Sequence, residues 1–334
     1  MKSKMIKPSP APLPELKLRN RKDKHGSVSK VAERLLIFIV AGLAGGLACA
    51  AINDGQSSLE NYLYAQASAP ISQMDFFMPE KKAAPNLYLD AKASVSLRVG
   101  ATGREKTIFK KNADEVLPIA SLTKLMTAAV VFENPNPYVL DKQIIVSEAA
   151  AAQNDVPVFG NLQARETYTV RRLLNLMLFY SSNDAAYALS EVMGNDEFIA
   201  AMNKKAQSLG LKDTVFYNSN GLDMDDGSAN HSSAADLIIL VKYILENHRE
   251  IFYFTIRSDM YLTENGIFNI KLWDGQALIG GKTGYTEKAG GCMILIVENQ
   301  KNQRYINILL GSTSPETRVP EMQKLINFAN NNDN

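Results

Sequence analysis

The chain has 334 residues, of which 46% are hydrophobic and 21% are charged, an ordinary composition for a globular protein with room for a large core. A formal net charge of +1 gives no reason to expect a nucleic-acid partner. The two cysteines and three histidines form no cluster with metal-ligand spacing, so we predict neither a metal site nor another cofactor.

The charges are unevenly placed at the N-terminus. Residues 1–34 hold ten Lys and Arg against three acidic residues, residues 35–52 carry no charge, and no basic residue follows until Lys81. Basic residues before an apolar span and not after it predict a cytoplasmic N-terminus. We therefore expect a basic cytoplasmic tail at 1–34 and a single-pass membrane anchor at 35–52, with the rest of the chain in the periplasm or outside the cell.

Cleavage of this apolar span is the alternative. Its eighteen residues lie near the lower limit for a membrane helix, and Ala48-Cys49-Ala50 fits a signal-peptide cleavage site. After cleavage the protein would be secreted. The basic region is long for a cleaved signal, which favours the retained anchor.

The residues after the span divide into a linker at 53–85, rich in Ser, Ala, Gln and Pro, and one folded domain at 86–330. Strands at both ends of this domain and helices between them predict an α+β fold, an antiparallel sheet flanked by helices with an all-helical insert. Asp184 is expected to cap one of the helices. Strands are expected at residues 94–99, 107–110, 277–286, 291–298 and 305–310, and helices directly after Ser121 and at 169–179, 184–193, 196–209, 233–246 and 316–328.

The segment from Pro118 to Thr127 contains Ser121 and Lys124, three residues apart at the start of an expected helix. Side chains at this spacing lie on one face of a helix, with about 5–6 Å between their Cβ atoms. The lysine amine can then take the proton of the serine hydroxyl, and the free N–H groups of the helix start favour a developing oxyanion. A capping serine beside a solvated lysine is the alternative interpretation of this pair.

Two further segments strengthen the catalytic interpretation. Ser181 and Asn183 form a Ser-x-Asn motif, and Lys282-Thr283-Gly284 forms a Lys-Thr-Gly motif. Together with Ser-x-x-Lys they occur in the order used by serine acyl-transferases that recognise penicillin. A Ser-His-Asp triad would instead need one of the three histidines beside Ser121, and it is disfavoured because Lys124 already has the required spacing.

These segments and their flanks resemble the low-molecular-mass penicillin-binding proteins, which are the D-alanyl-D-alanine carboxypeptidases of the serine peptidase S11 family. The resemblance covers roughly residues 86–330 and includes Asn220-Gly221-Leu222. It implies a β-lactamase/transpeptidase-like fold and removal of the terminal D-alanine from peptidoglycan stem peptides. It also implies that β-lactam antibiotics act as covalent inhibitors.

The resemblance assigns roles to nine residues. Ser121 is the expected nucleophile, Lys124 its base and Ser181 a proton relay to the leaving amine. Asn183 is expected to bind the substrate backbone and hold Lys124. The substrate carboxylate is expected at Lys282 and Thr283 with support from Arg318, while Gly284 leaves room for the substrate along the strand. The backbone N–H groups of Ser121 and Tyr285 are the expected oxyanion hole.

Three alternatives share these motifs: a DD-endopeptidase that cleaves peptidoglycan cross-links, a β-lactamase, and a non-catalytic wall-binding protein. The complete motif set disfavours the last. The β-lactamase is disfavoured because residues 215–220 contain no carboxylate for the deacylating water, and because Glu191 and Asn195 lie too close to Ser181 to supply one. Many relatives also carry a C-terminal β-rich domain and a terminal membrane helix, and we expect residues 35–52 to supply the tether instead.

Overall fold

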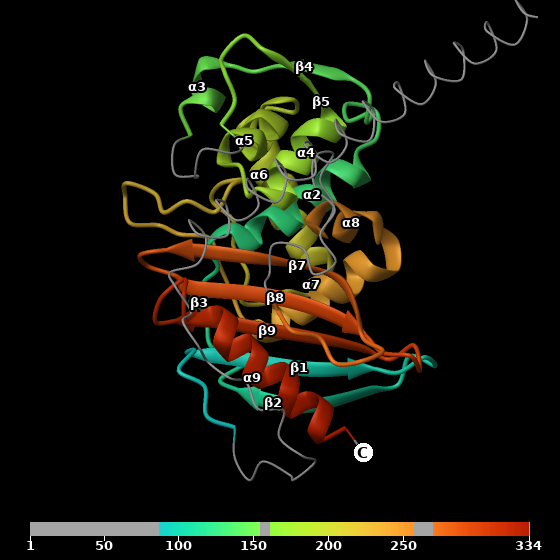
Figure 1. The fold of residues 1–334 in the computed structure, drawn as a ribbon. Coiled ribbons are helices and arrows are strands. Elements are labelled where there is room, and N and C mark those ends of the chain that lie inside the picture. Colours follow the sequence, from blue (N-terminus) through green and yellow to red (C-terminus); the bar gives the residue numbers. More distant parts are fainter. Residues whose placement is uncertain (1–86, 154–160, 257–269, 334) are drawn as a thin grey trace, which may run out of the picture. The chain divides into compact units, whose positions relative to one another are not determined.

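The computed structural model of the chain describes residues 87–153, 161–256 and 270–333, all within one compact unit that spans Asp75–Asn334 (Figure 1). The predicted tail, apolar span and linker at 1–34, 35–52 and 53–85 lie outside the described residues. Among the helices that are described, none is both long enough and apolar enough to span a bilayer. The boundaries assigned from the sequence therefore stay a prediction.

A five-stranded sheet forms the centre of the unit, with strand order β2-β1-β9-β8-β7 and every neighbouring pair antiparallel. Strand β7 is the last strand in this order, so one of its edges has no strand beside it among the described residues. The strands are β1 (Ala93–Val99), β2 (Glu105–Lys111), β7 (Ala277–Thr286), β8 (Gly290–Glu298) and β9 (Arg304–Ser312).

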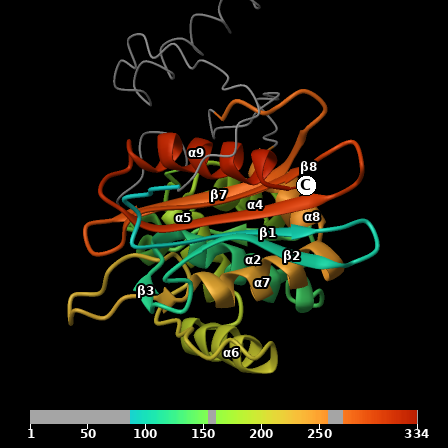
Figure 2. The same ribbon diagram turned by 90° about the horizontal axis from the view of Figure 1, so that it is seen from below.

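Helices cover both faces of the sheet, and this explains why the sequence of β8 is continuously apolar. Met293 and Leu295 pack with α9 (Arg318–Asn331), whereas Ile294 and Ile296 belong to the larger core on the opposite face. Helix α7 (Ala234–Asn247) lies on that opposite face, and Figure 2 shows the sheet between α9 and α7. Successive residues of a strand point to opposite faces, so a strand buried on both sides is apolar throughout.

A helical region lies beside the β7 edge of the sheet (Figure 1). Its central helix is α2 (Lys124–Glu133), which follows directly on the 3₁₀ turn η1 (Ala120–Thr123). The other helices are α3 (Glu148–Ala151), α4 (Val170–Phe179), α5 (Asn183–Glu191), α6 (Asn195–Ser208) and α8 (Glu250–Ile256), and the short paired strands are β3 (Leu117–Pro118) with β6 (His231–Ser232) and β4 (Gln143–Ile145) with β5 (Thr167–Thr169).

The predicted α+β class is confirmed, and the expected strands and helices occur with ends shifted by a few residues. One prediction is wrong: Ser182, not Asp184, caps α5, because its hydroxyl accepts the N–H of Ala185. The Asp184 carboxylate instead accepts the N–H of Leu162, at 2.9 Å. Helix α8 was not expected from the sequence.

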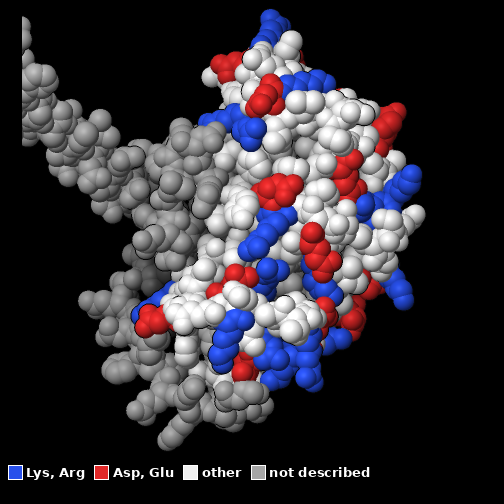
Figure 3. Space-filling model, turned by 90° about the vertical axis from the view of Figure 1, so that its right-hand side faces the viewer, with Lys and Arg blue, Asp and Glu red and all other residues white. Residues whose placement is uncertain are grey.

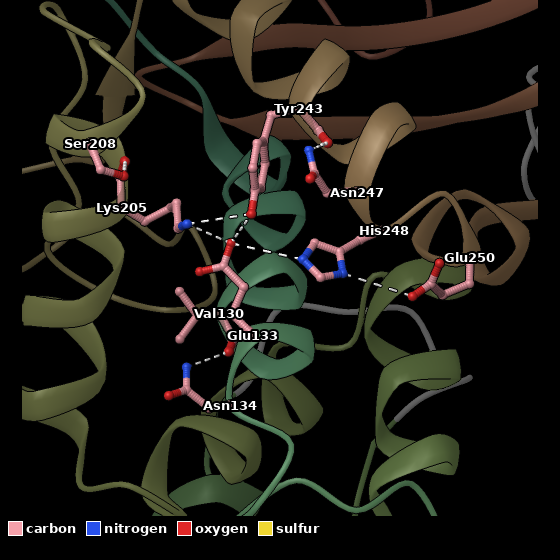
Figure 4. Close-up of polar contacts among 9 residues, drawn as sticks. All are labelled: Val130, Glu133, Asn134, Lys205, Ser208, Tyr243, Asn247, His248 and Glu250. Carbon is pink, nitrogen blue, oxygen red and sulfur yellow. Dashed lines mark hydrogen bonds and ion pairs between the residues drawn. The ribbon is translucent and has the colours of Figure 1, made fainter.

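The far end of α2 is held by a polar cluster around Glu133, shown in Figure 4. The Glu133 carboxylate accepts hydrogen bonds from Tyr243 of α7 and Lys205 of α6, the latter at 2.6 Å. His248, just after α7, lies 3.9 Å from the same carboxylate and 3.8 Å from Glu250. This cluster ties three helices together.

The surface seen in Figure 3 has mixed charge. Lys and Arg side chains lie interspersed with Asp and Glu over the described residues on this face. A face of this kind does not concentrate one sign of charge, unlike the basic surfaces that bind nucleic-acid backbones.

Candidate active site

Ser121 lies in the η1 turn, between strand β3 and helix α2. The preceding residue, Ala120, has a φ of +46°, a left-handed conformation that costs energy for a residue with a side chain. Gly221 lies against this turn so closely that an added Cβ would come within 2.1 Å of the Ala120 carbonyl oxygen. The turn is therefore fixed by close backbone contact, which holds the Ser121 hydroxyl in one position.

Lys124 is the first residue of α2, and its side chain is completely buried. Its Nζ lies 2.8 Å from the Ser121 Oγ, 2.7 Å from the Asn183 Oδ1 and 2.5 Å from the Asn220 carbonyl oxygen. Each of these three neighbours is neutral. Burial first, and then the positive charge of Lys282, lower the Lys124 pKa well below its ordinary value.

The neutral amine fits these three contacts well. It has two N–H hydrogens, which can be donated to the carbonyl oxygens of Asn183 and Asn220, and it keeps one lone pair. That lone pair is then available to the Ser121 hydroxyl. The geometry is that of a base poised to receive the Ser121 proton.

The second motif is held by the start of α5. Ser181 has a φ of +65°, and Ser182 caps the helix, so that Asn183 becomes its first residue. The backbone N–H of Ser182 also donates to the Leu176 carbonyl at 3.0 Å, which fixes the turn between α4 and α5. These constraints direct the Asn183 amide toward Lys124.

Lys282 approaches the same site from β7. Its amine is buried and donates to the Ser181 Oγ and to the Thr283 carbonyl oxygen, both at 2.9 Å. Burial and the nearby charge of Arg318 lower the Lys282 pKa to about 7. Near neutral pH this lysine therefore titrates, and a bound carboxylate would favour its charged form.

Gly284 allows β7 to lie directly against the nucleophile. A Cβ at this position would come within 2.9 Å of the Ser121 backbone nitrogen and 3.1 Å of the Ile119 carbonyl oxygen. Any larger residue would push the strand away from η1. Glycine is thus required by the close approach of β7 to η1, a reason different from the room for substrate that the resemblance implied.

The direction of the Tyr285 backbone follows from its strand. The Gly281 N–H donates to the Thr255 Oγ1 of α8 at 3.1 Å, so it points away from β8 toward the open edge of β7. In an antiparallel strand the N–H and C=O of every second residue point to the same edge. The N–H and C=O of Tyr285, four residues later, therefore also point to the open edge.

Arg318 is the first residue of α9 and lies behind β7. Its Nη1 donates to the Gly284 carbonyl oxygen at 3.0 Å, and its charge acts on Lys282. The structure thus brings the predicted site residues together from η1, α2, α5, β7 and α9: Ser121, Lys124, Ser181, Asn183, Lys282, Thr283, Gly284, Tyr285 and Arg318.

The loop that closes the other side of the site had no role predicted from the sequence. In this loop the Asn220 carbonyl contacts Lys124, Gly221 packs on Ala120, and Asp223 accepts the Thr286 hydroxyl at 3.1 Å. The Asn-Gly-Leu run marked a turn, but a backbone carbonyl as lysine partner leaves no trace in residue type. Glu191, the carboxylate considered for a β-lactamase, ends α5 and accepts the Ser147 hydroxyl at 2.8 Å.

Comparison with known proteins now identifies the family. The family model of peptidase S11, D-alanyl-D-alanine carboxypeptidase, matches residues 80–314. The chain belongs to the peptidase S11 family. This S11 chain is 33% identical over 235 residues to D-alanyl-D-alanine carboxypeptidase DacF of Bacillus subtilis, a match that covers 67% of the chain and 59% of the relative.

Solved structures agree with this assignment. Penicillin-binding protein D2 of Listeria monocytogenes, in its ampicillin-bound form, superposes with a TM-score of 0.63 at 32% identity, covering 73% of this chain and 99% of that one. The Streptomyces K15 DD-transpeptidase gives 0.62 at 26% identity, covering 74% and 99%. The S11 chain spans under three fifths of the length of the first curated relatives, 59% and 57% for the first two.

Proposed function

We propose that the protein is a serine-type D-Ala-D-Ala carboxypeptidase that removes the terminal D-alanine from peptidoglycan stem peptides through an acyl-serine intermediate. The observation that carries this proposal is the buried contact between Ser121 and an amine with only neutral partners. Membership of the S11 family supports the substrate class.

In the first step, the Ser121 Oγ attacks the carbonyl carbon of the penultimate D-alanine while its proton passes to Lys124. The carbonyl oxygen becomes an oxyanion that accepts the backbone N–H groups of Ser121 and Tyr285. Support for this pairing comes from the outward direction of the Tyr285 N–H and from the close approach of Gly284 to the Ser121 nitrogen.

In the second step, the peptide bond breaks and the leaving D-alanine amine takes a proton. The Ser181 hydroxyl passes to this amine the proton that Lys124 took from Ser121, so Lys124 is neutral again. The contact of Ser181 with Lys282 supports that role by holding the hydroxyl in the site. The charged forms of Lys282 and Arg318, with the Thr283 side chain, bind the D-alanine carboxylate. Water then attacks the acyl carbon and gives a proton to neutral Lys124, which passes it to the Ser121 Oγ as the acyl–oxygen bond breaks.

The direct test is covalent labelling. A fluorescent penicillin should label the protein, Ser121→Ala should not be labelled, and D-alanine should appear from a D-Ala-D-Ala peptide only with the unmodified serine. Undiminished labelling of Ser121→Ala would refute the assignment of the nucleophile.

A DD-endopeptidase is the second candidate, since the chain is 31% identical over 212 residues to the D-alanyl-D-alanine endopeptidase of Pseudomonas aeruginosa, covering 61% of the chain and 66% of the relative. Mass spectrometry of muropeptides before and after incubation separates the two. A carboxypeptidase shortens pentapeptides and leaves cross-linked dimers, whereas an endopeptidase converts dimers to monomers.

We propose that β-lactams acylate Ser121 and that the resulting acyl-enzyme is hydrolysed slowly. The Listeria relative was solved with ampicillin bound, and in this chain Glu191 is held by Ser147 rather than placed at Ser121. A chromogenic cephalosporin should therefore be hydrolysed poorly. Fast, sustained cephalosporin hydrolysis without D-alanine release would favour a β-lactamase. Absence of labelling and of both activities would favour a non-catalytic wall-binding protein.

The location outside the cytoplasmic membrane is also proposed, with residues 35–52 as the tether. The one-sided basic charge of residues 1–34 supports it. Protease added to spheroplasts should degrade the domain while the membrane is intact. Digestion only after lysis would reverse the proposed topology.

A further inference from the structure

Asn230 lies directly before the short strand β6, and it is almost completely buried, with 1% of its surface exposed. Its backbone carbonyl oxygen accepts the N–H of Ile119 at 3.0 Å, just before the η1 turn. Its side-chain Nδ2 donates to the Thr123 Oγ1 within that turn, also at 3.0 Å. Asn230 is therefore bonded to the turn on both sides of Ser121, although the reaction steps above give it no role.

The same amide holds the loop that carries the Asn220 carbonyl. The Asn230 Oδ1 accepts the backbone N–H groups of Tyr217 and Asn218, at 2.7 and 3.2 Å. Its Nδ2 also donates to the backbone and side-chain oxygens of Asn218, at 2.9 and 3.0 Å. Both polar atoms of this buried amide are thus bonded, and one side chain joins the loop to the catalytic turn.

Asn218 passes this constraint on to the Asn220 carbonyl. Its side-chain Oδ1 accepts the Gly221 N–H at 2.7 Å. The Gly221 N–H and the Asn220 carbonyl belong to one peptide group, which is planar. Fixing the direction of that N–H therefore also fixes the direction of the carbonyl oxygen that contacts Lys124.

We propose that Asn230 is a positioning residue for the acylation of Ser121. By bonding to both η1 and the loop, it holds the Asn220 carbonyl oxygen 2.5 Å from the Lys124 amine. This role rests on the function proposed above, and Asn230 acts only through its neighbours. With the carbonyl in place, the neutral amine has an acceptor for each of its two hydrogens, and its lone pair is left for the serine hydroxyl.

Loss of this clamp should change the site in two ways. A misdirected amine accepts the serine proton less well, and a displacement of about 1 Å can lower the rate by about 100-fold. A carbonyl oxygen also favours the charged form of an amine that donates to it, so its withdrawal should lower the Lys124 pKa further. The rise of the acylation rate with pH should then begin at lower pH. A residue that only stabilised the fold would not move this rise.

Lys124 sets this rise, since it must be neutral to act as the base. The charge of Lys282 on β7 acts on its pKa, and Arg318 of α9 acts in turn on Lys282. The carboxylates of Asp184 on α5 and Asp223 in the loop accept hydrogen bonds from other partners. The charged side chains of α6 and α8 shown in Figure 4 lie at the far end of α2. The variants below leave all of these groups in place.

The test measures acylation of the full-length protein by a fluorescent penicillin in stopped flow, as a function of pH. Asn230→Ala removes the clamp, so its rate at pH 7 should fall about tenfold to a hundredfold and its pH profile should move to lower pH. Thr123→Val removes only the acceptor in η1 at nearly constant shape, and should cause the same change at about threefold to tenfold. Thr123→Ser keeps the hydroxyl and should match the unmodified protein.

Asn203→Ala is the matched control. The Asn203 amide holds the same segment from α6, where it accepts the Phe216 N–H at 2.9 Å and donates to the Phe216 carbonyl oxygen at 2.8 Å. Its other printed bond, from Nδ2, goes to the Ile199 carbonyl oxygen within α6, and not to η1. Thermal unfolding should show a loss of stability in both asparagine variants. The acylation rate of Asn203→Ala should stay within about twofold, with an unmoved pH profile.

The outcomes separate this proposal from the proposed function. A rate in Asn230→Ala that is unchanged, or lowered equally at every pH, would overturn the role of Asn230 and leave the acyl-serine mechanism standing. An equal shift of the profile in Asn203→Ala would overturn it as well, because any loosening of the loop would then suffice. If Asn230→Ala does not fold, the Thr123 pair decides, and equal profiles for Thr123→Val and Thr123→Ser would overturn the clamp. An unmodified protein that is not labelled would overturn the proposed function itself.

Discussion

Helix α2 has a lysine amine near each of its ends, and the two amines have opposite surroundings. At its first residue, the Lys124 amine contacts one hydroxyl and two carbonyl oxygens, all neutral. At its last residue, the Lys205 amine of α6 contacts the Glu133 carboxylate at 2.6 Å and the Tyr243 hydroxyl (Figure 4). The Lys124 side chain is completely buried, whereas the Lys205 side chain is 20% exposed.

Their pKa values move in opposite directions. Burial and the charge of Lys282 lower the Lys124 pKa well below its ordinary value. Burial acts the same way on Lys205, but hydrogen bonds and charge interactions with Glu133 and Tyr243 outweigh it and raise that pKa. The Lys124 pKa is thus lowered by complete burial without a carboxylate partner, whereas Lys205 is less buried and has such a partner.

The largest predicted effect is on the rate of acylation by penicillin, when Lys124 and Lys205 are each replaced by arginine. Lys124→Arg should lower the rate of acylation by penicillin by about 10²- to 10⁴-fold, because a guanidinium keeps its proton and cannot act as a base. Lys205→Arg should leave the rate within about twofold, because arginine can still pair with Glu133. Stopped-flow labelling with a fluorescent penicillin measures both, and similar losses in the two variants would contradict the division of roles.

A second prediction concerns a variant in which Lys124 gains a carboxylate partner. Asn183→Asp places a carboxylate oxygen about where the amide oxygen now lies, 2.7 Å from the amine. The Lys124 pKa should rise, and once it lies above the working pH each further unit lowers the fraction of neutral amine about tenfold. Acylation should therefore be slowed about tenfold to a hundredfold at pH 7 and recover as the pH is raised.

The matched control is Glu133→Gln, which removes a carboxylate from the other lysine. Its acylation rate and pH profile should equal those of the unmodified protein. An Asn183→Asp profile that is lowered equally at every pH would instead mean that Asn183 acts only through substrate contacts.

A third prediction concerns Lys282, whose pKa lies at about 7 through burial and the charge of Arg318. The amine must hold its proton to attract the substrate carboxylate, so kcat/KM, which reports the free enzyme, should fall as the pH rises above 7. The bound carboxylate raises the Lys282 pKa, so kcat should be maintained to higher pH. Lys282→Arg keeps its charge and should show no alkaline fall in kcat/KM.

The fold was accessible from the sequence where local pattern and global packing agree. β7 was predicted with its observed ends, and the expected helix at 169–179 differs from α4 by its capping residue Thr169. The capping residue of α5 could not be predicted from the sequence. Ser182 and Asp184 are both good capping residues, and only the contact of Asp184 with Leu162 decides between them. Helix α8 has seven residues, too few for a periodic pattern.

The candidate site also has features that the sequence predicted and features that only the folded structure shows. Serine, lysine and asparagine at fixed spacings indicated the reacting groups, because the chemistry needs those residue types. The Asn220 carbonyl and the Thr286–Asp223 contact could not be predicted, since they join residues 96 and 63 positions apart through the folding of a loop. The pairing of Lys205 with Glu133, which makes the comparison with Lys124 possible, is also a property of the packed helices alone.

The smallest predicted effect concerns stability at the Glu133 end of α2. Glu133→Gln should lower the free energy of unfolding at pH 8 by about 1 kcal/mol, because it weakens one partly buried ion pair. The folded-state pKa of Lys205 is raised, so its stabilising contribution is complete below the ordinary pKa of 10.5 and disappears as the pH rises through the folded value. The difference between the two proteins in urea unfolding should therefore narrow above pH 10.5. Asp141→Asn is the control, since it removes the exposed pair with Arg171 and should cost only about 0.3 kcal/mol. Equal costs for the two variants, or a Glu133→Gln cost that does not change with pH, would show that the Lys205 pair stabilises the protein no more than a surface contact.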